Sequence, residues 1–305
     1  MTAPSAFAWY RPVLLIDNHR FLVHSHEDNM IFLNYEYRSA ANKPFVSTLC
    51  GPSGRNLVEN SPAEHLHHHG IWWGHGDVNG VDYYLELPHA LPQGAIEHLA
   101  FDSIIDEPAD GRSGLGRFGF EESLGWRDPT GAVVIDEQRW LVLAFRDGDH
   151  YTVDLDSTYT ARTDLTFGDT KESVLPGIRL AENMTGDVGG TITSSEGLTG
   201  EQATFGQPAR WIDVSAPRRV IFMPEEMVEG ITCFDHPSNP GHPTRWFTRE
   251  YGPISPFEGH HFYQDRQLAA GASFRLRHRL VIHRGNAAEA DLETKYAVYL
   301  QEVRA

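Results

Sequence analysis

The segment from His150 to Thr160 reads HYTVDLDSTYT and alternates between two kinds of side chain. Its odd-numbered positions are mostly aromatic or aliphatic, whereas from Thr152 on its even-numbered positions are threonine or aspartate. Because successive side chains of a strand point to opposite faces, this pattern predicts a β-strand with one face in a core. The face predicted to be buried carries Tyr151, Val153, Leu155, Ser157 and Tyr159, and the other carries Thr152, Asp154, Asp156, Thr158 and Thr160.

Similar runs lie on both sides of this segment. Ala132–Phe145 precedes it across Arg146–Asp149, where Asp and Gly favour a hairpin turn. Ala272–His283 alternates in the same way. Further short strands are predicted at Arg20–His26, Met30–Tyr37, Phe45–Cys50, Ala209–Ser215 and Arg218–Met223, with a polar turn at Glu27–Asn29.

Helix is predicted at the end of the chain, over Asn286–Val303. Asn286 and Glu289 have the spacing of a capping box, and a helical stripe follows at Leu292, Tyr296, Tyr299 and Val303. Many strands with Gly and Pro turns and one late helix predict an all-β fold, either an antiparallel β-sandwich or a barrel. We expect residues 1–305 to form a single domain with the helix packed on it.

Composition excludes several classes of protein. The 305 residues are 40% hydrophobic and carry a formal net charge of −17, which argues against nucleic acid and anionic membranes as partners. The first residues have no basic start and no long apolar run, so we expect no signal peptide, and no uninterrupted apolar run approaches the ~18 residues of a membrane span. Two cysteines, Cys50 and Cys233, fit a reduced interior, so we expect a cytoplasmic protein.

His65–Asn79, reading HLHHHGIWWGHGDVN, is the segment richest in chemistry, with five of the 17 histidines. If it were a strand, His65, His67 and His69 would share one face, a set suited to zinc, copper, manganese or iron. Asp77 could complete that site or orient a histidine. The alternative is a tight loop whose histidines bond to the backbone. Trp72 and Trp73 offer flat faces of the kind on which a sugar ring stacks.

Three other segments pair charged or imidazole groups with turn residues. Phe167–Ser173 (FGDTKES) holds Lys171 and Glu172, an oxyanion holder and a general base, or else a solvated turn. Phe234–Pro243 (FDHPSNPGHP) holds His236 and Asn239 on a loop stiffened by proline, or else forms a surface turn. The third segment, Pro256–Tyr263 (PFEGHHFY), carries Glu258, His260 and His261 and could close a pocket.

Together these motifs resemble the bacterial PmoA-like family, which carries the label "methane oxygenase". The resemblance covers roughly residues 30 to 284. The family core is H-P-H-H-R-G-L-W, and here Leu66 replaces the proline and His69 the arginine. The resemblance extends to His65, His67, His68, Gly70, Trp72, His75, Asp77, Asn79, Gly80, Glu172, Asp235, His236, Pro237 and Asn239.

The resemblance implies a fold like that of galactose mutarotase and a role beside sugar oxidoreductases and isomerases. We therefore expect an enzyme that acts on a sugar or keto-sugar glycoside by proton transfer, in an epimerisation, elimination or hydrolysis. The alternatives are a non-catalytic sugar- or metal-binding partner of a sugar oxidoreductase and a metal-dependent oxygenase. The expected partners are a small carbohydrate and either a sugar oxidoreductase or further copies of this chain.

These expectations assign a role to each candidate residue. At least three of His67, His68, His75, His236 and one of His260 or His261 should share one pocket with Glu172 or Asp77 and with Trp72 or Trp73. The predicted catalytic residues are His67, His68, His236 and Glu172; the predicted substrate-binding residues are Trp72, Trp73, His75, Asp77, Asn79, Lys171, Asn239 and His261; and a divalent metal would use His65, His67 and Asp77.

Overall fold

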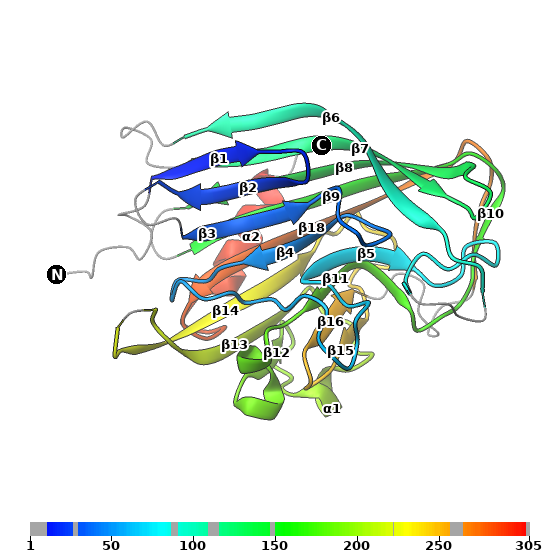
Figure 1. The fold of residues 1–305 in the computed structure, drawn as a ribbon. Coiled ribbons are helices and arrows are strands. Elements are labelled where there is room, and N and C mark those ends of the chain that lie inside the picture. The colour runs from blue at the N-terminus through cyan, green and yellow to red at the C-terminus, as the bar shows by residue number, and fades with distance from the viewer. Residues whose placement is uncertain are drawn as a thin grey trace.

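Two antiparallel sheets of eight strands each pack face to face (Figure 1). The computed structural model describes residues 11–26, 30–86, 91–108, 116–146, 150–221, 223–256 and 265–302. The predicted all-β antiparallel sandwich with a C-terminal helix is therefore confirmed, while the assignment to one domain stays a prediction. Among the described residues, no helix is both long and apolar enough to cross a bilayer.

The first sheet is built mainly from the N-terminal part of the chain. Its strands, in spatial order, are β1 (Pro12–Ile16), β2 (Arg20–Ser25), β3 (Ile31–Glu36), β4 (Phe45–Leu49), β5 (Ile71–His75), β11 (Ser173–Arg179), β16 (Pro253–Pro256) and β15 (Trp246–Thr248).

The second sheet contains the long central hairpins. Its strands, in spatial order, are β12 (Thr191–Ser194), β13 (Trp211–Arg219), β14 (Glu226–Asp235), β18 (Ser273–Arg284), β9 (His150–Ala161), β8 (Val133–Phe145), β7 (Arg117–Arg127) and β6 (Ala95–Glu107). The remaining elements are the strand pair β10 (Leu165–Phe167) and β17 (Arg266–Leu268), the helices α1 (Glu201–Thr204) and α2 (Leu292–Glu302), and the 3₁₀ turns η1 (Glu182–Met184) and η2 (Gly186–Val188).

The core lies between the sheets, where the alternation of β9 predicts it. Tyr151, Val153 and Tyr159 are at most 1% exposed. Phe21 of the first sheet meets Phe120 of the second edge to face, with ring centroids 5.0 Å apart. Such contacts hold the two sheets together.

The core also contains a charged cluster that captures one of the two adjacent tryptophans. The Arg139 guanidinium lies 3.8 Å from the centre of the Trp73 ring. Its Nε donates to Glu137 (2.8 Å) and its Nη1 to the Tyr35 hydroxyl (3.0 Å). Trp73 is thus a core residue, and its predicted role in sugar binding is wrong.

Two predicted elements have different bounds in the structure, the C-terminal helix and the strand at Arg218–Met223. Helix α2 begins at Leu292, not Asn286, because Asp291 has a left-handed backbone (φ 49°) that interrupts the first turn. The capping-box bonds still form, since Asn286 Oδ1 accepts from the N–H of Glu289 (3.1 Å) and the Asn286 N–H donates to Glu289 (3.0 Å). The strand predicted at Arg218–Met223 is instead the end of β13, which stops at Arg219.

Candidate functional site

The histidine-rich segment before β5 is a loop of tight turns. The His65 N–H donates to the Pro62 carbonyl, and the His68 N–H donates to the His65 carbonyl, both at 2.9 Å. Of the two alternatives, the strand with His65, His67 and His69 on one face does not form, because these turns rotate the side chains out of alternation. The segment is the tight loop of the other alternative, but the rings of His68 and His69 bond to side chains and not to the backbone.

The loop covers a pocket on the outer face of the first sheet. We call it the histidine pocket, and its volume of about 330 Å³ lies within the range of about 300–1,000 Å³ typical of small-molecule sites. Loops from four parts of the chain meet here. The side chains that line it include His65, His67, His68, Trp72, Tyr84, Lys171, Glu172, Arg249 and Tyr251.

Four rings form a continuous stack along the pocket. His68 lies on Trp72 (centroids 5.1 Å apart), His65 on His68 (4.5 Å) and Tyr251 beside His65 (5.5 Å), all nearly parallel. Trp72 is 1% exposed, whereas Tyr251 is 36% exposed. Trp72 thus supports the wall, and Tyr251 is the ring that a ligand can reach.

His68 is held between a cation and a phenol. Arg179 Nη1 faces its Nδ1 at 3.5 Å, and the Tyr84 hydroxyl lies 3.1 Å from its Nε2. A guanidinium only donates, so Nδ1 must be the acceptor, and a neutral His68 then carries its proton on Nε2. Burial and the neighbouring His67 lower the pKa of His68 to about 2, so the ring is neutral at pH 7.

This arrangement orients the hydroxyl of Tyr84. Since His68 Nε2–H donates to the Tyr84 oxygen, the phenolic hydrogen is left to point elsewhere, and the Tyr84 side chain lines the pocket. Burial raises the pKa of Tyr84 well above its ordinary value, so the hydroxyl stays protonated. Tyr84 is therefore a hydrogen-bond donor for a ligand atom.

The imidazole of His67 is more accessible to solvent than that of His68. It is half-buried and lies edge-on to His68, with ring centroids 4.7 Å apart. Burial and the nearby His65 lower the pKa of His67 to about 4. At neutral pH its ring is uncharged and can accept a proton.

Charged groups complete the rim. Lys171 Nζ lies 3.5 Å from Glu172 Oε1, and the exposed fractions of the two side chains are 73% and 30%. Glu172 reaches the pocket because the start of β11 pairs with the end of β5, with Ser173 opposite His75. Lys171 and Glu172 are thus brought to the predicted site.

His69 supports the pocket from behind. Its ring stacks on Phe45 at 4.0 Å, and its Nε2 lies 2.7 Å from Glu86 Oε1. Lys43 Nζ donates to the same oxygen at 2.8 Å. Burial alone would raise the pKa of Glu86, but the bonds from His69 and Lys43 lower it to about 2.

Three predicted ligand-binding residues serve other purposes. His75 points to the inner side of the sheet, against Phe167 (5.3 Å), and is 1% exposed. The Asp77 carboxylate accepts the Gly80 N–H (2.8 Å), and the Asn79 side chain accepts the Thr166 N–H (2.7 Å). Asp77 and Asn79 thus shape the turn after β5 and bind it to β10.

No metal site is assembled from the predicted ligands. Within the described ranges, no three His, Cys, Asp or Glu side chains come together as ligands for an ion. The grouping of His65, His67 and Asp77 is not formed, because Asp77 lies in the turn after β5 and does not line the histidine pocket. Cys50 and Cys233 are free and buried.

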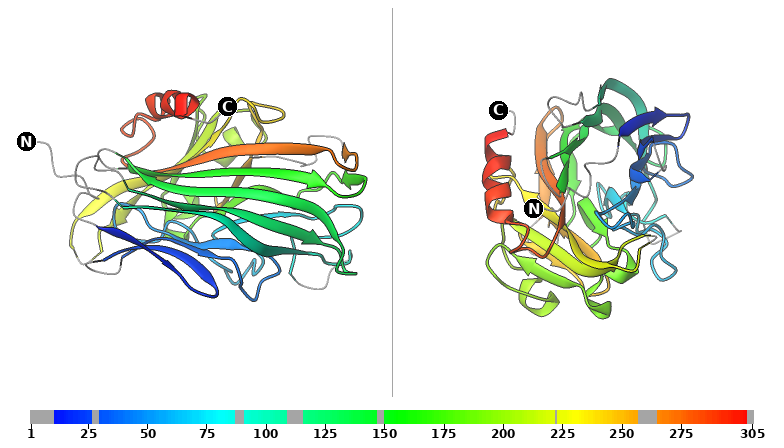
Figure 2. Two further views of the ribbon diagram at one scale, coloured as in Figure 1. Left: turned by 90° about the horizontal axis from the view of Figure 1, so that it is seen from above. Right: turned by 90° about the vertical axis from the view of Figure 1, so that its left-hand side faces the viewer.

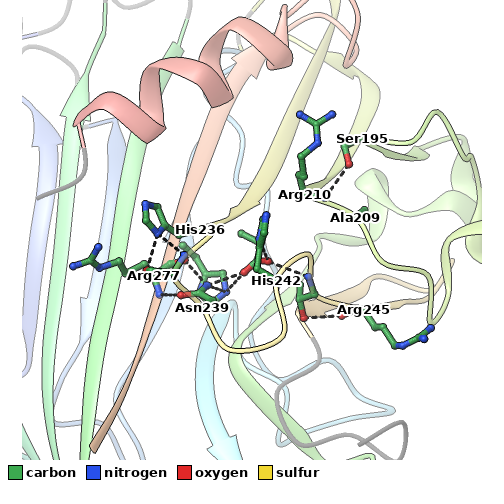
Figure 3. A network of polar contacts seen from close by, with 12 residues as sticks. Ser195, Ala209, Arg210, His236, Asn239, His242, Arg245 and Arg277 are labelled. Carbon is green, nitrogen blue, oxygen red and sulfur yellow. Dashed lines mark hydrogen bonds and ion pairs between the residues drawn. The ribbon is translucent and has the colours of Figure 1, made fainter. Parts of the chain in front are cut away.

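The segment Phe234–Pro243 closes on itself at the end of β14 (Figure 3). His236 Nδ1 lies 2.7 Å from the Ser238 hydroxyl, and its ring contacts Tyr299 of α2 at 5.4 Å. The Asn239 side chain accepts from the Arg277 N–H (2.8 Å) and donates to Asp235 (2.7 Å). The structure therefore places His236 and Asn239 outside the histidine pocket.

Two of the histidines predicted to converge share one pocket within the described residues, and the convergence of at least three stays a prediction. His67 and His68 share the histidine pocket with Glu172 and Trp72, and His65 joins them, but His75 and His236 do not. The predictions for Glu258, His260 and His261 concern residues outside the described ranges.

Three residues that line the histidine pocket, and Arg179 which faces His68 from outside its lining, were not predicted from the sequence. Tyr84 follows the turn after β5, Arg179 is the last residue of the otherwise largely apolar strand β11, and Arg249 and Tyr251 follow β15. Tyr-Tyr at Tyr83 and Tyr84, directly after a carboxylate, was the one available signal.

Comparison with known proteins gives a family and distant structural similarities. The model of a family of unknown function, DUF6807, matches residues 23–297. Among curated proteins, no sequence matches this chain.

Solved structures with similar strand arrangements include two α-galactosidases. One is from Lactobacillus brevis (10% identity, TM-score 0.39, 90% of this chain and 39% of that chain), and a GH36 enzyme is from Geobacillus stearothermophilus (9%, 0.39, 90% and 41%). This chain spans about two fifths of the length of these enzymes. A galactose mutarotase related enzyme from Lactobacillus acidophilus is also similar (9%, 0.34, 90% and 98%).

Proposed function

The chain belongs to the DUF6807 family of unknown function, and we propose that its histidine pocket binds a carbohydrate and transfers protons at a carbon next to a carbonyl group. The observation that carries this proposal is the pairing, in one pocket, of a neutral proton acceptor (His67) with an oriented hydroxyl donor (Tyr84). The resemblance to PmoA-like sequences and a cytoplasmic location stay predictions.

The walls of the pocket suit a polyol. The exposed ring of Tyr251 provides an apolar face for the C–H groups of a sugar, and the charged side chains of Lys171, Glu172 and Arg249 can bond to hydroxyl groups. About 330 Å³ is enough for a small ligand to be largely enclosed.

The proposed step begins with a 2-keto or 3-keto sugar. Neutral His67 takes the proton of the C–H next to the carbonyl, and the electron pair moves to the carbonyl oxygen. The Tyr84 hydroxyl donates a hydrogen bond to that oxygen as its negative charge develops. Return of this proton from His67 to the same face restores the starting sugar. Delivery of a proton from solvent water to the opposite face, while His67 releases its own proton to solvent, gives an epimer.

Glu172 and His68 have different parts in this proposal. Glu172 is the second proton acceptor of the pocket, on the side of β11. His68, fixed between Arg179 and Tyr84, is a positioning residue and does not exchange protons, since its pKa of about 2 keeps it neutral.

The first test is a panel of aldoses, ketoses, keto-sugars and glycosides offered to the protein in D₂O. Saturation-transfer NMR reports binding, and the loss of C–H signals reports proton exchange. We expect at least one keto-sugar to bind and exchange. Binding without exchange would support a non-catalytic sugar-binding partner instead, and no binding of any member would contradict the proposal.

Replacing Tyr251 with alanine should weaken the binding of the sugar found in this panel. Loss of the exposed ring removes the apolar face, and we expect the Kd to rise about tenfold, or about 1.4 kcal/mol. Tyr251→Phe keeps the ring and should bind nearly as well as the wild type. Equal binding by Tyr251→Ala, measured by titration calorimetry, would show that the ligand does not contact this ring.

A further inference from the structure

Three arginines alternate along β18 on the outer face of the second sheet. Arg275, Arg277 and Arg279 point to the same side, because side chains two residues apart in a strand share a face. Helix α2 lies over this face (Figure 2). A cavity of about 200 Å³ lies between the arginines and α2, and we call it the Arg277 pocket. Its lining includes the three arginines, Trp140, Asp156 and Tyr299.

The two outer arginines are fully paired. Arg275 donates through Nε and Nη2 to both oxygens of Asp156, at 2.6 and 2.5 Å. Arg279 donates to both oxygens of Asp154 (2.5 and 2.9 Å) and to Glu302 (2.8 Å). These guanidinium groups are therefore neutralised by the protein itself.

Arg277 is different. Its Nε lies 3.6 Å from Asp156 Oδ2, which Arg275 already occupies, and within the described part of the chain its guanidinium has no hydrogen-bond acceptor. The residue is only 8% exposed. Figure 3 shows its guanidinium pointing away from the loop that carries His236 and Asn239.

The other charges around the cavity cancel one another. Glu302 also pairs with Arg146, and Arg117 on the rim pairs with Glu107.

Burial lowers the pKa of His278 to about 4, and burial and the charge of Arg277 lower that of His236, so neither ring adds charge at pH 7. Asp235 is turned to His242 (2.7 Å) and Asn239. One cation, Arg277, is left over.

We propose that the Arg277 pocket is a second ligand site, which binds a small molecule through a carboxylate or phosphate group held by Arg277. A buried cation whose nearest carboxylate is already hydrogen-bonded to another arginine is unfavourable, and a guanidinium presents parallel N–H groups that match such oxyanions. Trp140 and Tyr299 provide an apolar border for the carbon skeleton of the ligand. The small volume restricts the ligand to the size of a sugar acid or sugar phosphate.

The test uses titration calorimetry and thermal unfolding of the intact protein with gluconate, glucose 6-phosphate, inorganic phosphate and neutral glucose. At least one anion should bind and raise the Tm, and glucose should bind here at least tenfold more weakly than gluconate or glucose 6-phosphate. Tighter binding of gluconate identifies a carboxylate site, and tighter binding of the phosphates identifies a phosphate site. No binding of any anion at millimolar concentration would overturn the proposal.

Variants of opposite expected sign locate the site. Arg277→Gln should weaken anion binding at least tenfold, whereas Asp156→Asn should tighten it severalfold, because it removes the carboxylate nearest to Arg277. Arg127→Gln removes an exposed arginine that pairs with Glu97 on the same sheet, and it should bind like the wild type. If Arg277→Gln and Arg127→Gln bind equally, or if Asp156→Asn binds more weakly, the site is not built on Arg277. The circular dichroism of each variant checks that it is folded.

Discussion

A Tyr84→Phe variant should lose proton exchange on the keto-sugar about 10²–10³-fold, because it lacks one hydrogen-bond donor aimed at a developing oxyanion. The phenol is placed by His68 at 3.1 Å, and His68 is in turn faced by Arg179. The substitution removes only the hydroxyl, so the ring contacts of Tyr84 with His67 and Trp72 remain. We therefore expect kcat to fall while KM changes little.

The neighbouring Tyr83 provides a matched control. Its ring packs on Trp126 (5.1 Å), and its buried hydroxyl has no hydrogen-bond partner within the described residues. Tyr83→Phe should leave the rate unchanged. Single-turnover deuterium exchange followed by NMR compares the two variants, and equal rates for Tyr84→Phe and the wild type would remove Tyr84 from the mechanism.

The free energy of unfolding should fall by about 3 kcal/mol between pH 7.5 and pH 6.0. Burial lowers the pKa values of His68 (about 2), His75 (about 3), His150 (about 3) and His278 (about 4), and solvent screens the more exposed His67, so these four rings carry most of the slope. In the unfolded chain each titrates near 6.5, so that state binds more protons as the pH falls. The contribution of these four rings to stability is complete above pH 6.5 and is lost as the pH falls towards their folded-state pKa values. Between pH 7.5 and pH 6.0 the loss is about 0.8 kcal/mol per histidine.

Urea unfolding at several pH values measures this slope. His75→Gln removes one buried titrating ring, and it should reduce the slope by about a quarter whatever its effect on the stability itself. His19→Gln removes an exposed histidine and should leave the slope as it is. A stability that does not change between pH 7.5 and 6.0 would show that these rings are not neutral in a buried environment.

The sequence predicts the sandwich well, because alternation reports directly which face of a strand is buried. The run from His150 to Thr160 became the buried strand β9, and its neighbours β8 and β18 pair with it in register. The start of α2 was misplaced because a left-handed residue, Asp291, leaves no clear mark in the pattern.

The pocket was predictable where its members are close in sequence or joined by one strand pair. His65, His67, His68 and Trp72 lie within eight positions, and β5 pairing with β11 brings in Glu172. Whether Trp72 or Trp73 faced the pocket could not be read from two adjacent tryptophans.

Contacts between distant loops could not be predicted. Arg179 is an arginine inside an apolar strand, and nothing in its neighbours indicates that it faces His68. The sequence around His236 does not show whether its loop joins a pocket or folds back on Asp235. In the structure, the hydrogen bonds of Asn239 to Asp235 and Arg277 hold the loop folded back.

The most direct test of the central claim compares His67→Ala and His236→Ala for deuterium incorporation from solvent into the keto-sugar. His67 lines the histidine pocket and His236 does not, so the first variant should lose about 10²–10⁴-fold in rate and the second should keep the wild-type rate. Both variants should retain the circular dichroism of a β-sheet protein. Full activity of His67→Ala, or loss of activity in His236→Ala alone, would contradict the assignment of the reaction to the histidine pocket.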